Sequence, residues 1–177
     1  MEGTFEQLLA LDPVCLDDAA RLDLLEALDR LMSRASARVE RTLAALVDLS
    51  DEKQFIREEI RLALRWSDGF TRARCVQATK LVDDLPEALD RHETGELNTA
   101  QARALAEATM PLERRHCTEV LERVLPRAGQ QTLTEFKNSV TRAVHRVDPR
   151  TAAKKHEDDK QRRDVSLRAL PNGMAGI

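Results

Sequence analysis

The residues of this sequence whose types and spacing could do chemistry are basic ones. They recur at a helical spacing in the middle of the chain. They are Lys53, Arg57, Arg61 and Arg65 and, after a polar turn, Arg72, Arg74 and Lys80. Like charges four residues apart destabilise an isolated helix, so the first four indicate an anionic counterpart. Nucleic-acid phosphates are such a counterpart, and we expect the six residues from Arg57 onward to contact them.

The counterpart of this basic stripe can also be internal. Residues 1–52 hold twelve acidic and five basic residues, whereas residues 53–177 hold nineteen acidic and twenty-three basic ones. Asp23, Glu26 and Asp29 of the acidic first third are therefore alternative partners for the arginines. The sequence does not separate this hypothesis from contact with DNA.

Catalytic chemistry is not indicated. The four histidines, His92, His116, His145 and His156, are widely spaced and fall on predicted helices, so we expect them to be solvated side chains. No Ser-His-Asp grouping, glycine-rich phosphate loop or H-E-x-x-H motif is present. We therefore expect no catalytic residue, no metal site and no small-molecule cofactor, and we expect that the chain alone is not an enzyme.

The elements that must position the basic stripe are two helices within residues 53–85. Ile56, Ile60 and Leu64 share one face of the first, and Cys75, Ala78, Leu81, Val82 and Leu85 share one face of the second. Ser67 is an N-cap candidate between them, and Gly69 is free to take a positive φ. The pattern resembles the outline of a helix-turn-helix, whose second helix would carry cations toward a DNA groove.

A long helix is predicted over residues 17–48, with Asp17 as its N-cap. Its apolar positions step by four or three without Gly or Pro, and we expect Leu24, Leu28, Met32, Ala35, Val39, Leu43 and Leu46 to point inward. Such a helix is about 45 Å long. It either packs on the rest of the chain or pairs with a second copy as a homodimer.

Further helices are predicted up to residue 147, and the chain changes character after it. Capping patterns at Asn98 and Thr132 open two of these helices. Residues 149–164 form a charged helix with almost no apolar side chain, and a strand, the turn Pro171-Asn172-Gly173 and a short second strand follow. We expect residues 1–148 to form a helical domain and residues 149–177 to lead, through a truncated hairpin, toward a missing C-terminal domain.

Composition favours an all-α bundle with one long N-terminal helix. Aromatic residues make up 3% of the 177 residues, while 42% are apolar and 33% are charged. The net charge of −3 excludes a wholly basic nucleic-acid binder. Cys15, Cys75 and Cys117 lack any metal-binding spacing, and neither a membrane span nor a signal peptide is indicated, so we expect a cytoplasmic protein.

A succession of short motifs carries a family likeness. In order they are EEIRLAL, A..L…LP over residues 78–86, G.L..AQARALAEAT, VLPRA, LT..F…V.RAV…DP and RR.V.LR.LP.GMA. This succession resembles the domain of unknown function 222 family, which typically forms the N-terminal part of actinobacterial HNH endonuclease-like proteins. The likeness covers nearly the whole chain. It implies a helical region ahead of a metal-dependent HNH nuclease domain, whose residues are absent here.

Two classes of function follow. In the first hypothesis, which the resemblance implies, we expect the chain to be a non-catalytic module of an HNH endonuclease-like protein that binds or positions nucleic acid through the basic stripe. Alternatively, it is a helical oligomerisation or protein-interaction scaffold built on the 17–48 helix, or a remnant of a truncated nuclease. DNA and a second copy of the chain are the partners that these hypotheses imply, and no membrane is among them.

Overall fold

Helices form almost all of the described structure. The structure is a computed structural model that describes residues 5–50, 52–149, 168–169 and 175–176. The helices are α1 (Phe5–Leu9), α2 (Asp18–Asp48), α3 (Lys53–Leu64), α4 (Asp68–Asp84), α5 (Pro86–Thr94), α6 (Thr99–Thr109), α7 (Arg114–Ala128) and α8 (Leu133–Val147), with a 3-10 turn, η1 (Pro13–Cys15), after α1. The predicted all-α fold is confirmed.

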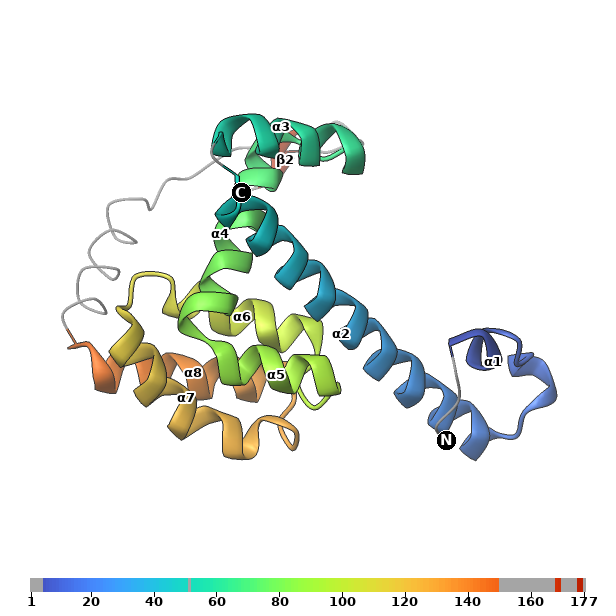
Figure 1. Cartoon of the computed structure of the whole chain (residues 1–177). Coiled ribbons are helices and arrows are strands. Elements are labelled where there is room, and N and C mark those ends of the chain that lie inside the picture. Colours follow the sequence, from blue (N-terminus) through green and yellow to red (C-terminus); the bar gives the residue numbers. More distant parts are fainter. Residues whose placement is uncertain (1–4, 51, 150–167, 170–174, 177) are drawn as a thin grey trace.

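The long helix predicted over residues 17–48 is α2. The Asp17 side chain accepts a hydrogen bond from the Ala20 backbone N–H at 2.8 Å, which satisfies one of the free donors at the start of the helix. Figure 1 shows α2 running diagonally past the other helices, with α1 folded against one end and α3 at the other. One helix therefore spans the molecule and connects its two extremes.

The face of α2 that packs inward is only in part the one predicted: Leu24 and Leu43 are buried as expected, and Leu28 is half-buried. Met32, Ala35, Val39 and Leu46 are exposed, whereas the buried stripe over this part of the helix runs through Ser33, Ala37, Glu40, Leu43, Ala44 and Val47. Small residues on this stripe let α2 approach α4 and α5 closely, because ridges of one helix fit into the grooves of the other. Met32, Val39 and Leu46 are left on the exposed side.

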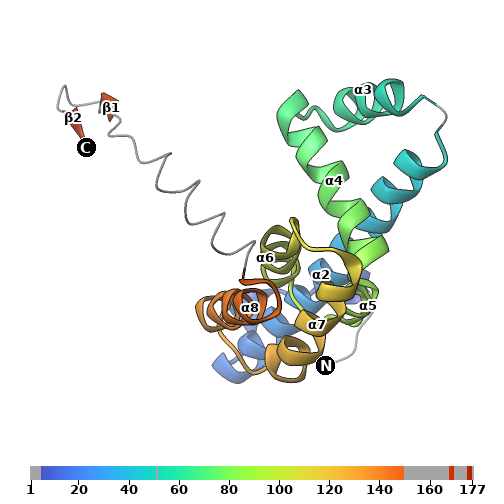
Figure 2. The same cartoon turned by 90° about the vertical axis from the view of Figure 1, so that its left-hand side faces the viewer.

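Helix α4 lies between α2 and the rest of the bundle. It contacts α2 and α3 on one side and α5, α6 and α7 on the other. Leu81 and Leu85 join the largest core cluster, which α5 to α8 complete around Phe136. Cys75 and Ala78 join a second cluster with the C-terminal half of α2 and with Ile60 of α3. Figure 2 shows α2 and α4 rising from the bundle to meet α3.

Capping boxes begin two of the bundle helices, as predicted. Asn98 and Gln101 form one at the start of α6, and Thr132 and Glu135 form the other at the start of α8. The α8 helix ends at Val147 with Asp148 as its C-cap. The sequence pattern thus located these helix ends from local hydrogen-bonding chemistry alone.

The C-terminal stretch is described only in part. β1 (Arg168–Ala169) and β2 (Ala175–Gly176) pair in antiparallel fashion, with Arg168 opposite Gly176. The predicted turn over residues 171–173 and nearly all of the charged helix predicted over 149–164 lie outside the described residues. The hairpin and the following domain therefore stay predictions.

Candidate nucleic-acid interface

The corner between α3 and α4 is built by a tight turn over residues 65–67. Arg65 takes the left-handed conformation (φ 54°), and the Trp66 N–H bonds back to the Arg61 carbonyl oxygen at 3.0 Å, which ends α3. Ser67 is the N-cap of α4, as predicted, and its side chain accepts a hydrogen bond from the Phe70 N–H. Gly69 does not use its freedom to take a positive φ, because it lies in the first turn of α4, and Arg65 is the left-handed residue of the turn instead.

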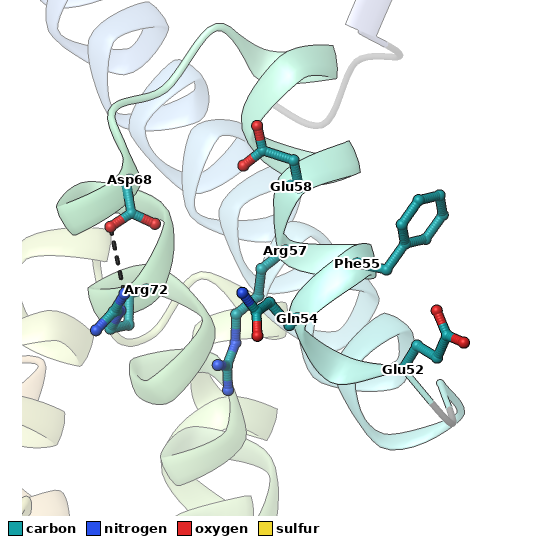
Figure 3. Close-up of a pocket in the computed structure, with 7 residues that line it drawn as sticks. All are labelled: Glu52, Gln54, Phe55, Arg57, Glu58, Asp68 and Arg72. Atoms are coloured by element: carbon teal, nitrogen blue, oxygen red, sulfur yellow. Dashed lines mark hydrogen bonds and ion pairs between the residues drawn. The ribbon is translucent and has the colours of Figure 1, made fainter.

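An open cleft of about 820 Å³ lies between the two helices. Its lining residues are Glu52, Gln54, Phe55, Arg57, Glu58, Asp68 and Arg72. Figure 3 shows the Arg57 side chain extending from α3 toward α4 beside Gln54, with Arg72 on the facing helix. Two of the six predicted cations thus meet at one cleft, together with three carboxylates.

Arg57 and Arg65 are the cations of this corner that have no carboxylate partner among the described residues. Arg57 is half-buried, and its Nε atom is shielded from solvent without a hydrogen-bond acceptor in the described part of the chain. Arg65 is exposed at the tip of the turn. Neither guanidinium group is therefore held by a carboxylate of the described chain, and that of Arg65 is open to an external anion.

Arg61 and Arg72 are engaged by carboxylates one helical turn away. The Arg61 Nε donates to Glu58 Oε2 at 2.9 Å, and this hydrogen bond raises the pKa of Arg61 and lowers the pKa of Glu58 from their usual values. The Arg72 guanidinium lies 3.3 Å from Asp68, and both side chains are largely exposed. Exposed pairs of this kind contribute little to stability, so an external anion can exchange with either carboxylate.

Arg74 and Lys80 do not belong to this surface, which corrects their assignment as phosphate contacts. Arg74 is buried and donates to Glu40 Oε1 at 2.5 Å and to Gln77 Oε1 at 2.7 Å. Lys80 is buried and donates to Asp84 Oδ2 and to the Leu112 carbonyl oxygen, each at 2.7 Å. Both cations hold α4 against its neighbours, because α4 is covered on two sides.

The acidic helix α2 does supply an internal counterpart, but at one residue that the sequence did not indicate. Glu40 pairs with Arg74, whereas Asp23, Glu26 and Asp29 are exposed and make no ion pair with any described residue. A signal for Arg74 and Glu40 was present in the pattern. Arg74 stands on the same helical stripe as Ala78 and Leu81, and Glu40 stands on the stripe of Ala37 and Ala44.

Aromatic rings gather at this corner, a feature that the sequence analysis missed. The chain has four phenylalanines, one tryptophan and no tyrosine. Phe55, Trp66 and Phe70 all lie on α3, on the turn or at the start of α4, and Phe55 and Phe70 are 61% and 47% exposed. Trp66 packs edge-to-face on Phe70 with ring centroids 4.9 Å apart. The cluster of rings in the local sequence was the available signal.

The histidines do not form a catalytic or metal site in the described residues. His145 is exposed and His116 is half-buried, whereas His92 is buried and its Nδ1 lies 2.8 Å from the Leu97 carbonyl oxygen, so its predicted solvation is wrong. Burial lowers the pKa of His92 below its usual value. His156 lies outside the described residues. No group of three or more His, Cys, Asp or Glu side chains that could hold a metal occurs within the described parts of the chain.

Comparisons with known proteins leave the fold and site without a named relative. No protein-family model matches the chain, and no curated protein or solved structure is significantly similar to it. The resemblance to the domain of unknown function 222 family therefore stays a prediction. No helix among the described residues is both long and apolar enough to cross a membrane.

Proposed function

We propose that this chain is a non-catalytic helical module that contacts nucleic acid at the α3–α4 corner, as part of an HNH endonuclease-like protein. The observation that carries the proposal is the meeting of available arginines and exposed aromatic rings on one corner. Arg57 and Phe55 line the same cleft, Arg65 lies on the turn that ends α3, and Phe70 lies on the first turn of α4. Guanidinium groups bind phosphates, and aromatic rings stack on bases.

The charge of the corner limits how many phosphates it can hold. Glu52, Glu58 and Asp68 line the cleft with the arginines, and each carboxylate repels a nearby phosphate. Arg61 and Arg72 must first leave their carboxylate partners, whereas Arg57 and Arg65 have none to leave. We therefore expect about two phosphate contacts, made by Arg57 and Arg65.

The exposed rings favour unpaired bases over a continuous duplex. A phenylalanine ring stacks on a base only where that base is free of its neighbours, and each such contact contributes about 1–3 kcal/mol. Phe55 lines the cleft and is 61% exposed, and Phe70, 47% exposed, presents a second ring on the first turn of α4. Single-stranded segments, or the frayed ends of a duplex, are the nucleic-acid form that fits this corner.

The test is the affinity for labelled oligonucleotides, single-stranded and duplex, measured by fluorescence anisotropy over a series of salt concentrations. Two contacts predict a slope of log K against log salt of about −1.4 on single strands. Arg57→Gln combined with Arg65→Gln should flatten this slope, and Phe55→Ala should weaken binding at every salt concentration. Arg114→Gln with Arg115→Gln, two exposed arginines at the start of α7, is the matched control. Equal binding by both double variants would contradict the proposal.

The proposed module should not cut nucleic acid by itself. No metal-binding group of side chains is found in the described residues, and hydrolysis of a phosphodiester by an HNH site needs a metal that activates water. Incubation of the purified chain with plasmid DNA and Mg²⁺, Mn²⁺ or Zn²⁺ should leave the plasmid supercoiled. Metal-dependent nicking that survives repurification would show that the chain has a catalytic site.

A further inference from the structure

Helix α2 carries a second apolar stripe besides the one that packs on α4 and α5. Its positions alternate in steps of three and four residues, the spacing of a coiled-coil heptad. The stripe, called the α2 seam below, consists of Leu25, Leu28, Met32, Ala35, Val39, Thr42, Leu46 and Leu49. Over 25 residues it covers about 36 Å of helix.

The α2 seam is open to solvent along most of its length. All of its members except Leu28 are exposed, and Leu28 is half-buried against the cluster that α1 forms with the start of α2. Figure 1 shows α2 at the edge of the molecule, with the bundle on one side only. Isolated exposed apolar residues are ordinary, but a heptad row in which six of the eight members are both exposed and apolar indicates a binding surface.

We propose that the α2 seam binds the α2 seam of a second copy of this chain, so that two chains form a homodimer. A repeat of 3.5 residues keeps the same row of side chains facing a partner helix as the two helices wind around each other. In a dimer with two-fold symmetry, the seam of each chain faces the identical seam of the other chain, so no other molecule is needed as a partner. The proposal does not depend on the contact with nucleic acid.

Residues 150–167 are a poor match for the α2 seam. Residues 150–167, the longest stretch outside the described structure, contain only Ala152, Ala153, Val165 and Leu167 as apolar residues, and these do not recur at heptad spacing. A second copy carries a seam of matching length and spacing.

The flanks of the seam are also compatible with pairing. The positions that border the α2 seam are 24, 29, 31, 36, 38, 43, 45 and 50. Only two of these residues, Asp29 and Arg38, are charged. A parallel pair of helices places neither of them against a like charge. Thr42, the polar member of the seam, already donates its hydroxyl to the Arg38 carbonyl oxygen at 2.8 Å and can be buried without an unsatisfied donor.

The first experiment measures the mass of the whole chain by light scattering and sedimentation from about 1 μM upward, where an interface of standard size should be occupied. We expect twice the single-chain mass of 20.0 kDa. Met32→Glu combined with Val39→Glu should halve the measured mass. Leu62→Glu combined with Val76→Glu is the control and should leave it unchanged, because these apolar side chains are exposed to nearly the same extent (63% and 45%, against 67% and 42%) but lie on α3 and α4.

The second experiment keeps the proposal testable if the glutamate variant fails to fold by circular dichroism. In a Cys15→Ser background, which removes the exposed native thiol, Ala35→Cys with Val39→Cys places two thiols in the middle of the seam. Mild oxidation should link two chains covalently, whichever way the helices run. A monomeric wild-type chain, a dimer that the seam glutamates leave intact, or the absence of the covalent dimer would each overturn the proposal.

Discussion

The guanidinium of Arg74 and the carboxylate of Glu40 form an ion pair across the α2–α4 contact, at 2.5 Å and with side chains that are 6% and 2% exposed. Glu40 shares a helical stripe with Ala37 and Ala44, and Arg74 shares one with Ala78 and Leu81, so both charges lie among small and apolar side chains. Glu40 Oε2 and Arg74 Nε are buried without a hydrogen-bond partner in the described structure. The pair is therefore incompletely satisfied, and its charges hold α2 to α4 at the cost of desolvation.

Breaking this pair on one side should strongly destabilise the protein. Arg74→Met leaves the Glu40 carboxylate buried without a cation, and we expect the free energy of unfolding in urea to fall by about 3–5 kcal/mol. Replacing both residues, Glu40→Met with Arg74→Met, removes both charges and should recover most of this loss. As a control, Arg72→Gln, which breaks the exposed pair with Asp68, should change stability by less than about 0.5 kcal/mol. Equal losses in the single and double variants would contradict the prediction.

The left-handed conformation of Arg65 predicts a substitution that separates stability from binding. A side chain in this conformation costs about 1 kcal/mol, which glycine avoids, so Arg65→Gly should raise the free energy of unfolding by up to that amount. Arg65→Gln keeps the backbone cost and removes the charge, and should leave stability unchanged. Both variants should weaken nucleic-acid binding to a similar extent. Stabilisation by glutamine as large as by glycine would show that the charge, not the backbone, is unfavourable.

Local signals in the sequence were sufficient to place the helices and several of their ends. Asp17, Ser67, Asn98 and Thr132 cap helices through hydrogen bonds with residues three positions away, and such contacts depend on nothing distant in the chain. The exception was the α3–α4 turn. There an arginine takes the backbone conformation usually given to glycine, because the contacts of the two helices fix where the turn falls.

The sequence could not decide which face of a helix is buried when two faces are eligible. On α2 the row containing Met32 and Val39 and the row containing Ala37 and Ala44 both have helical periodicity, and only the fit against α4 selects the second. On α4, Arg74 and Lys80 are buried because neighbours cover it on two sides. Partners far away in the chain, such as Glu40 and the Leu112 carbonyl oxygen, then neutralise charges that look solvated in the sequence.

The buried His92 predicts a loss of stability on mild acidification. Burial lowers its pKa in the folded chain, with smaller opposing effects from Leu97 and Glu40 and further lowering from Arg103 and Arg74. Between the unfolded value, 6.5, and the lower folded value, the unfolded chain binds the additional proton. The free energy of unfolding should therefore fall as the pH drops below about 6.5, by at most about 1.4 kcal/mol per pH unit.

The variant His92→Asn isolates this contribution, since an asparagine amide can still donate to the Leu97 carbonyl oxygen but does not titrate. In urea unfolding of this variant, the free energy of unfolding should no longer depend on pH between 6.5 and 5. The variant His145→Asn, which replaces an exposed histidine, should retain that dependence. The carboxylates with lowered pKa, Glu58, Glu93 and Glu135, stabilise the fold above their usual value of 4.5 and lose this effect at lower pH. The carboxylates therefore contribute to the pH dependence of stability at a lower pH than His92 does. A wild-type profile that is flat down to pH 5 would count against a lowered His92 pKa.

The capping box at the start of α6 should contribute unequally through its two members. Asn98 accepts a hydrogen bond from the Gln101 N–H at 2.9 Å, and Asn98→Ala should lower the free energy of unfolding by about 1 kcal/mol, the usual contribution of a cap. Gln101 is buried and also donates to the carbonyl oxygens of Ala128 and Gln131, at 3.0 and 3.3 Å, between α7 and α8.

Gln101→Ala keeps the backbone N–H that donates to Asn98, but it removes the side-chain oxygen that accepts from the Asn98 N–H at 3.1 Å and leaves the buried Ala128 carbonyl without its donor, so we expect a loss of about 2–3 kcal/mol, larger than that of Asn98→Ala. Asn98→Asp keeps a side-chain acceptor at the cap and should be close to wild type. Chemical denaturation of the three variants at neutral pH gives the comparison. A smaller loss for Gln101→Ala than for Asn98→Ala would show that the contacts of Gln101 with the α7–α8 connection do not hold α6 in place.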